Sequence, residues 1–277
     1  MLPKLPLGDA MEWIVDWIDQ YFGWLLDGIS AVLNFLVNGF QDVLLFAPPL
    51  VTILVFGILV WIVTRKDWKL ALLCIAGLLL INNLDLWELS METIALVVTS
   101  AIIALIIGVP LGILAAMNDP MNSVLKVFLD FMQTMPSFVY LIPAVIFFGL
   151  GNVPGMVATV IFAMPPTIRL TNLGIRQVPK ELNEVADSFG ATPIQKLLKV
   201  QLPVAMPTIL AGVNQCIMLA LSMTVIAAMI GAMGLGYQVL VGIQRVDIGT
   251  GFEAGLAIVI IAIILDRITQ NLIKTTQ

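Results

Sequence analysis

The sequence predicts an all-α protein that crosses a membrane several times. Its 277 residues have a mean hydropathy of +1.04, and 60% of them are hydrophobic whereas only 11% are charged. One soluble domain could not bury that much apolar surface. The apolar residues also gather in long runs, many of them of the roughly 17–25 residues that cross a hydrocarbon core as a helix. The chain therefore belongs in a bilayer, as a multi-pass protein of the cell membrane.

The segment 1–42 predicts an amphipathic helix at the outer face of the membrane. Aromatic and aliphatic residues cover most of its surface, and a narrow stripe is polar. Such a helix lies in the interface with its aromatics at headgroup level. A spanning helix is the alternative, at the cost of burying several carboxylates. The start has no signal-peptide pattern, so we expect mature protein there. The stripe consists of Glu12, Asp16, Asp19, Gln20, Gly23, Asp27, Ser30, Asn34 and Asn38.

Seven apolar runs follow, and each is a candidate transmembrane helix. The first two form an accessory pair within residues 43–87, and the other five form a main domain over residues 88–270. Residues 271–277 are a cytoplasmic tail. The runs are 43–64, 69–84, 92–116, 134–150, 154–170, 204–230 and 252–270.

The basic residues predict the orientation, because Lys and Arg near a span are retained on the cytoplasmic side. If residues 65–68, 117–133, 171–203 and the C-terminal tail are cytoplasmic, eleven of the thirteen basic residues lie inside. Only Lys4 and Arg245 lie outside. This places the N-terminus outside and the C-terminus inside. The pI near 4.6 then reflects an acidic outer face and gives no indication of nucleic-acid binding.

The runs lack the groups that drive chemistry or ion coupling within a membrane. The chain has no histidine, and Cys74 and Cys216 lie in apolar runs without metal-ligand spacing, so we expect neither a metal site nor a disulfide. No ionisable side chain falls at the centre of a run, and Ser222 and Thr224 have no neighbouring base. Energy must therefore come from a partner, or the protein is a passive pore.

The longest cytoplasmic connection, 171–203, predicts a helical hairpin. Pro179 can open a first helix, which Gly190 can end in the left-handed conformation that glycine favours. Thr192, Pro193 and Gln195 then form a capping-box pattern for a second helix. This helix is expected to stop near Pro203, where the sixth run begins. A well-capped hairpin without further role is one interpretation, and a knob that receives force from another protein is the other.

The hairpin resembles the "EAA" loop of binding-protein-dependent ABC importer permeases, with the pattern E-A-A, three residues, G, nine residues, I-x-L-P. Glu184, Ala186, Gly190, Leu202 and Pro203 match the pattern, whereas valines occupy positions 185 and 200. The stretches 129–155, 161–179 and 234–270 are similar to permeases for glycine betaine, proline betaine and related quaternary ammonium osmoprotectants.

The resemblance implies a type I importer transmembrane domain and a set of partners. These are a second permease copy, cytoplasmic ABC ATPase subunits and an extracellular substrate-binding protein. ATP and Mg²⁺ would be bound by the ATPase, since this chain has no Walker-type loop and needs no cofactor of its own. The residues expected to couple to the ATPase are Glu184, Ala186, Gly190, Ala191, Thr192, Pro193, Lys196, Lys199, Leu202 and Pro203.

Quaternary ammonium groups bind aromatic faces, so aromatic residues in the runs are candidates for the substrate path. They are Phe138, Tyr140, Phe147, Phe148 and Phe162, and packing is the alternative role for each. The outer loop 231–252 is rich in glycine and is expected to meet the binding protein. The GxxxG pattern at Gly108 and Gly112 indicates close helix contact, with the seam between two copies as one candidate place. An osmotically gated channel and an assembly scaffold remain the alternative functions.

Overall fold

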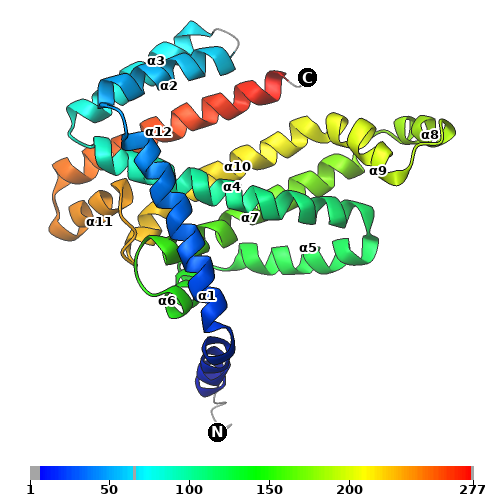
Figure 1. The fold of residues 1–277 in the computed structure, drawn as a ribbon, viewed down its shortest axis with the longest axis horizontal. Coiled ribbons are helices and arrows are strands. Elements are labelled where there is room, and N and C mark those ends of the chain that lie inside the picture. The colour runs from blue at the N-terminus through cyan, green and yellow to red at the C-terminus, as the bar shows by residue number, and fades with distance from the viewer. Residues whose placement is uncertain (1–6, 65–66, 276–277) are drawn as a thin grey trace.

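The structure is a computed structural model that describes the backbone of residues 7–64 and 67–275, and the side chains of residues 12–64 and 67–271. These residues form helices and turns without a strand (Figure 1). The elements are α1 (Leu7–Leu45), α2 (Pro49–Val63), α3 (Trp68–Asn83), α4 (Trp87–Met117), α5 (Asp119–Thr134), η1 (Ser137–Tyr140), α6 (Leu141–Phe148), α7 (Asn152–Arg176), α8 (Lys180–Ser188), α9 (Pro193–Lys196), η2 (Leu197–Gln201), α10 (Leu202–Ala228), α11 (Leu235–Arg245) and α12 (Ile248–Thr275).

Helices α4, α7 and α10 form the centre of the molecule, because small residues let their backbones approach closely. A Cβ atom on Gly112 of α4 would lie 2.6 Å from Cβ of Thr171 and 2.8 Å from the carbonyl oxygen of Ile168, both on α7. Gly108 faces Thr167 one turn away. The GxxxG pattern thus marks a contact between two helices of one chain. The alternative that placed it at the seam between two copies is wrong.

Five helices of the described residues are long and apolar enough to cross a membrane. A sixth span results if α5 and the η1–α6 segment, which meet at a bend of 108°, count as one broken span. Helices α2 and α3 have 15 and 16 residues and are shorter than the roughly 20 that a perpendicular span needs. The seven-span count and the orientation therefore stay predictions.

Helix α1 runs across the other long helices, on the half of the molecule away from α8 and α9 (Figure 1). Its C-terminal half packs on the bundle through Leu33 and Val37, and the Nε2 of Gln41 donates to Oε1 of Glu92 at 3.2 Å. It continues to Leu45, so the boundary expected after residue 42 falls inside a helix. The part from Glu12 to Leu45 meets the criterion for a span, yet its direction suits a helix along the membrane surface. The location of residues 1–42 stays a prediction.

Residues 117–133 form a helix where a cytoplasmic loop was expected, and the run 134–150 is not one straight span. Helix α5 occupies most of the first segment, and the chain bends at Pro136 before η1 and α6. Asn122, Lys126 and Asp130 lower the mean hydropathy of α5. Their spacing of four residues, however, puts them on one face, which leaves an apolar face for the surroundings.

The segment 231–252 also contains a helix where a loop was expected. Helix α11 packs against α12 where Gly242 meets Gly251, and a Cβ on Gly242 would lie 2.6 Å from the Gly251 Cα. The glycines there serve close packing of two helices. Cys74 and Cys216 are both buried and free.

Candidate functional site

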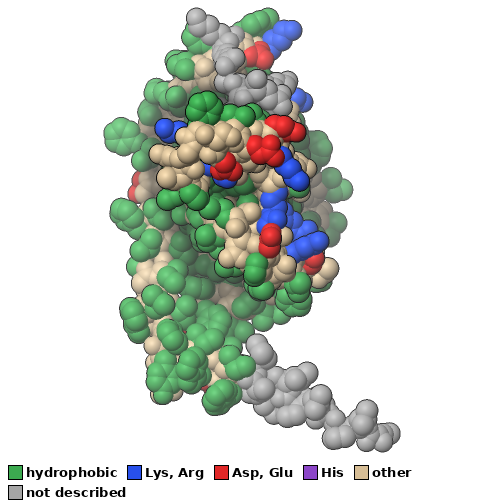
Figure 2. All heavy atoms as spheres, turned by 90° about the vertical axis from the view of Figure 1, so that its right-hand side faces the viewer, with side chains coloured by type: hydrophobic (Ala, Val, Ile, Leu, Met, Phe, Trp, Pro, Cys, Tyr) green, Lys and Arg blue, Asp and Glu red, His purple; other side chains and the backbone are tan. Residues whose placement is uncertain are grey.

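The α8–α9 hairpin ends the long axis of the molecule, and charged side chains gather at this end among hydrophobic ones (Figures 1 and 2). Its turn is a Schellman motif. The Gly190 N–H donates to the Asp187 carbonyl at 3.0 Å, and the Ala191 N–H donates to the Ala186 carbonyl at 3.0 Å. Gly190 has φ +73°, and no atom lies within 4 Å of where its Cβ would be. Glycine is therefore required by the backbone conformation and not by lack of space.

The capping box predicted at Thr192 is present. The Gln195 N–H donates to Oγ1 of Thr192 at 3.3 Å, and the Thr192 N–H donates to Oε1 of Gln195 at 2.9 Å. Both helices of the hairpin are thus capped at the turn that joins them. Pro193 occupies the first helical position, as expected.

Two side-chain contacts hold the hairpin together. The Lys196 ammonium donates to both carboxylate oxygens of Asp187, at 2.7 and 2.9 Å, so this lysine is engaged within the chain. Nε2 of Gln201 donates to Oδ1 of Asn183 at 3.0 Å. Lys199 is exposed and has no ion pair among the described residues. Of the two lysines, Lys199 is the one that could meet an acidic partner surface.

The second helix does not stop at Pro203, contrary to the expectation. A π-helical turn over Leu197–Gln201 joins α9 to α10, so that residues Pro193–Ala228 form one element. The wider turn accommodates Pro203, which has no N–H and whose ring would otherwise interrupt the backbone hydrogen bonds of the helix. Leu197 and Leu202 pack against Ile175, Ala205 and Ile209. The hairpin is thereby packed directly onto α7 and α10.

The hairpin exposes large apolar side chains that no described residue covers. Phe189, next to the turn, is 88% exposed, and Ile194 on α9 is 66% exposed. We call the exposed side chains of the hairpin the apolar patch. It consists of Leu182, Val185, Phe189, Ile194 and Leu198. None of the five is among the coupling residues named from the sequence, although the resemblance implied a contact surface from Ala191 to Lys199, which contains Ile194 and Leu198. Large apolar side chains in an otherwise polar stretch are the sequence feature that could have identified these positions.

Glu184 is exposed on α8, and its carbonyl accepts a hydrogen bond from the Ser188 hydroxyl at 2.8 Å. Ala186, in contrast, is buried beneath the turn. The expected coupling residues of the hairpin therefore have two kinds of environment. The turn is formed by Ala186, Gly190 and Ala191, whereas Glu184 is exposed on α8.

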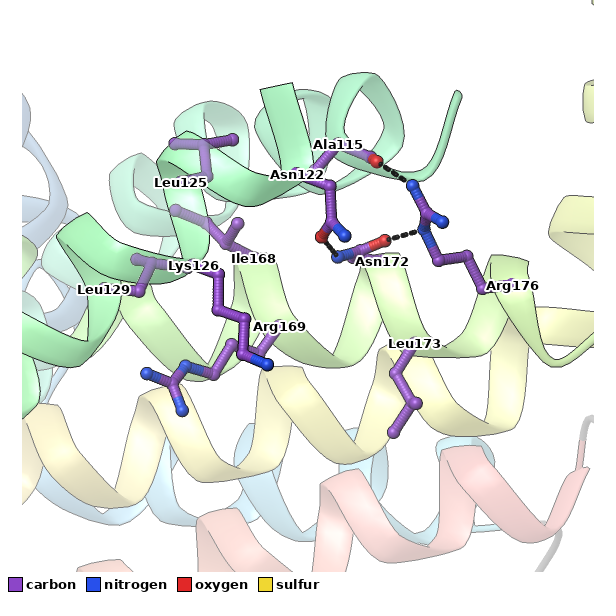
Figure 3. Close-up of a pocket in the computed structure, with 10 residues that line it drawn as sticks. All are labelled: Ala115, Asn122, Leu125, Lys126, Leu129, Ile168, Arg169, Asn172, Leu173 and Arg176. Atoms are coloured by element: carbon purple, nitrogen blue, oxygen red, sulfur yellow. Dashed lines mark hydrogen bonds between the residues drawn. The ribbon is translucent and has the colours of Figure 1, made fainter. Parts of the chain in front are cut away.

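A second cluster joins α5 to α7 beside the hairpin (Figure 3). Asn172 donates from Nδ2 to Oδ1 of Asn122 at 2.6 Å, and Arg169 is 2.5 Å from Asp130. We call this set, with Arg176 and Asp119, the polar ladder. It borders a pocket of about 300 Å³, which Lys126 also lines. The ladder was not predicted, although Asn122 and Asp130 on α5, with the pocket-lining Lys126 between them, recur at helical spacing.

Arg176 closes the end of the polar ladder. Its Nη2 donates to the carbonyl of Ala115 at 2.8 Å and to Oδ1 of Asp119 at 2.7 Å, while Nε donates to Oδ1 of Asn172 at 2.9 Å. It thereby binds one of the last free carbonyls of α4 and the first residue of α5. Since Arg176 is also the last residue of α7, it connects the root of the hairpin to the α4–α5 corner.

Residues 108–276 match the family described as "Binding-protein-dependent transport system inner membrane component". The chain belongs to this family. It is 56% identical to the glycine betaine/carnitine transport permease protein GbuB of Listeria monocytogenes, over 100% of this chain and 98% of that protein. It is 52% identical to the glycine betaine transport system permease protein OpuAB of Bacillus subtilis, over 98% and 95% of the two chains.

The fold of this permease is also that of solved ABC importer permeases. A chain of the inward-facing MetNI methionine ABC transporter superposes with a TM-score of 0.63 at 21% identity, covering 69% of this permease and 96% of that chain. A chain from an amino acid ABC transporter gives a TM-score of 0.52 at 22% identity, covering 70% and 95%. The type I importer fold and the membrane location expected from the sequence are confirmed.

The aromatic candidates of the permease lie in different surroundings. The Tyr140 hydroxyl donates to the carbonyl of Met132, and its ring meets that of Phe162 edge to face with centroids 5.8 Å apart. Phe148 packs against the largest hydrophobic cluster, Phe147 is partly buried on α6, and Phe138 is 52% exposed. The structure therefore pairs Tyr140 with Phe162 and spreads the other three over η1 and α6. Their part in a substrate path stays a prediction.

Proposed function

We propose that this permease is the translocation subunit of an ATP-driven importer for glycine betaine or a related quaternary ammonium osmoprotectant. The observation that supports it best is the full-length similarity, at 56% and 52% identity, to two permeases named for glycine betaine transport. Two copies would form the path, with a substrate-binding protein delivering the solute on the outer side. The chain itself would carry out no chemistry.

The apolar patch supports the proposed contact with a cytoplasmic ATPase. It lies on a hairpin whose two helices are capped at their turn and tied by the Lys196–Asp187 pair. A rigid knob with an exposed apolar surface suits a groove on a partner, because a few side chains buried in well-packed pockets, aromatic ones among them, carry most of the energy of such interfaces. ATP and Mg²⁺ would bind to that partner.

The proposed route of force leaves the hairpin in two directions. One runs through Leu197 and Leu202 into the cluster around Ile175. The other runs through Arg176, at the end of α7, to the α4–α5 corner. Closure of an ATPase dimer would therefore move α4, α5, α7 and α10 together, as a change of access from one side of the membrane to the other requires.

Reconstitution tests the proposal. The permease is placed in proteoliposomes with its ATPase and binding-protein partners, and uptake of radiolabelled glycine betaine is measured with and without ATP. We expect uptake that requires ATP and the binding protein, and ATP hydrolysis that rises when both binding protein and glycine betaine are present. Flux that persists without ATP would favour an osmotically gated channel. Absence of a stable ATPase complex would refute the importer proposal.

A further inference from the structure

A groove runs between α3 and α12 and has one polar and one apolar part. The polar part has a volume of about 360 Å³, and the apolar part has a volume of about 300 Å³. Leu73 lines both, so the two parts adjoin at this side chain. The polar part is lined by Asp67, Lys69, Leu70, Leu73, Arg267, Gln270 and Asn271.

The apolar part follows the two helices in opposite directions. It extends along α3 from Leu73 to Leu80 and along α12 from Ile264 back to Leu256. Eight or nine helical residues rise about 12 Å, which fits within the roughly 15 Å hydrocarbon depth of one leaflet. Its floor is the close contact of Gly77 with Ile260, where a Cβ on Gly77 would lie 2.6 Å from Cγ2 of Ile260.

The polar part carries a positive charge that the chain leaves available. Lys69 and Arg267 are both exposed, and neither belongs to the ion pairs found among the described residues. Among the described residues that line this part, Asp67 alone is acidic, and it is engaged by the start of α3. Its Oδ1 accepts the N–H groups of Lys69 at 3.1 Å and Leu70 at 3.5 Å. Two cations therefore face the mouth of the groove.

The residues next to the polar part are of the kinds expected at the depth of lipid headgroups. Trp68, at the start of α3, is 64% exposed, and tryptophan at a helix end is typical of the membrane interface. Below it, the α3 residues between Lys69 and Leu80 are apolar without exception. The start of α3 is thus charged and aromatic and its continuation to Leu80 is apolar, as expected of a helix that enters the hydrocarbon from the interface.

We propose that this groove binds one anionic phospholipid, with its phosphate group on Lys69 and Arg267 and an acyl chain along the apolar part. A cationic end followed by an apolar channel of leaflet depth matches the two ends of such a lipid. Basic pockets between transmembrane helices recognise anionic headgroups in this manner. The proposal does not depend on which solute the permease transports.

Native mass spectrometry of the full-length permease tests the site. The purified protein is exchanged into micelles that contain equal amounts of phosphatidylglycerol and phosphatidylcholine, and the retained lipid is counted at each subunit number. We expect retention of phosphatidylglycerol by the wild type. The double variant Lys69→Gln with Arg267→Gln should bind it about 30-fold more weakly, because each basic residue near a surface contributes about 1 kcal/mol.

Matched variants separate this site from general electrostatics. Lys126→Gln with Lys180→Gln removes two equally exposed, unpaired lysines elsewhere and should leave retention unchanged. Lys69→Arg with Arg267→Lys should also retain the lipid. Ala76→Trp fills the apolar part while keeping both charges, and it should reduce retention as strongly as the charge variant.

Several results would overturn the proposal. Equal loss in the two double Gln variants would mean that net charge alone binds the lipid. Retention by Ala76→Trp, or displacement of the lipid by soluble glycerol phosphate, would mean that no acyl chain occupies the groove. A third contrary result has two parts: Ala76→Trp changes the number of subunits, and the double Gln variant at Lys69 and Arg267 retains as much lipid as the wild type. It would mean that a second copy covers this face. A melting temperature near that of the wild type shows that each variant is folded.

Discussion

The hydroxyl of Thr93 accepts a hydrogen bond from the backbone N–H of Leu235 at 2.8 Å, although 142 residues separate the two in the chain. The same hydroxyl donates to the Leu89 carbonyl at 2.9 Å. Thr93 and Leu235 are both buried. The contact needs glycine at position 234, because a Cβ on Gly234 would lie 2.6 Å from Oγ1 of Thr93. The start of α4 is thereby fixed to the turn between α10 and α11.

Thr93→Val should lower the stability of the permease by about 1–3 kcal/mol, because the shape is kept while the Leu235 N–H loses its acceptor. Thermal unfolding in detergent measures the effect. Thr93→Ser keeps the hydroxyl and should melt close to the wild type. Equal melting temperatures for Val and Ser would show that the hydrogen bond contributes nothing.

Gly190→Val should abolish ATPase association and uptake while the protein still inserts into the membrane. A β-branched residue at φ +73° is disfavoured by roughly 1–2 kcal/mol, so the Schellman turn reopens and the apolar patch loses its shape. Co-purification with the ATPase is the readout. Gly190→Asn should be milder, since asparagine tolerates this conformation.

Gly149 provides a stringent control for the glycine variant. It has φ +74° and open surroundings, its ψ of −146° is close to a region that only glycine adopts readily, and it lies at the end of α6, away from the hairpin. Gly149→Val should therefore keep the ATPase bound. Retained association and uptake in Gly190→Val would refute the coupling role of the hairpin.

Phe189→Asp should remove ATPase binding without changing the melting temperature, because its side chain contacts solvent and not the core. A buried apolar anchor of an interface typically accounts for about 2 kcal/mol or more of binding, roughly a 30-fold loss of affinity. Binding of the purified ATPase to the permease in nanodiscs measures it. Glu181→Ala, an exposed change on the same helix, should leave binding intact.

Arg176→Gln should reduce stability by about 1–2 kcal/mol, since hydrogen bonds that involve a charged group at a partly exposed site are lost. It should also lower the ATP hydrolysis stimulated by substrate more than it lowers basal hydrolysis, if the α4–α5 corner takes part in coupling. A variant that loses only stability would leave Arg176 as a purely structural residue.

The hydrogen bonds of Asp247 predict that the stability of the permease decreases slightly at acid pH. The side chain and N–H of Thr250 donate to its carboxylate at 2.8 and 3.2 Å, and these hydrogen bonds lower the pKa of Asp247 below its usual value of 3.8. The folded pKa is the lower one, so this stabilisation is complete above the usual pKa and is lost as pH falls through the folded pKa. Asp247→Ala should melt earlier than the wild type at neutral pH, and the gap should close in strong acid.

The hairpin shows how much local sequence determines. Gly190, Thr192 and Gln195 act on backbone groups within five residues, so the turn and the capping box could be predicted without knowledge of neighbours. Composition likewise determined that the chain is a multi-pass membrane protein, and the spacing from Glu184 to Pro203 indicated its family.

Tertiary structure alone decided which helices meet. Averaged hydropathy assigned residues 117–133 to a loop, whereas pairing with Arg169 and Asn172 makes the polar face of α5 a contact with α7. Gly112 could have packed against any helix, and the fold selected Thr171. Caps depend on short-range backbone geometry that the sequence itself encodes. Helix partners, the polar ladder and the α3–α12 groove depend on long-range packing, which only the folded chain establishes.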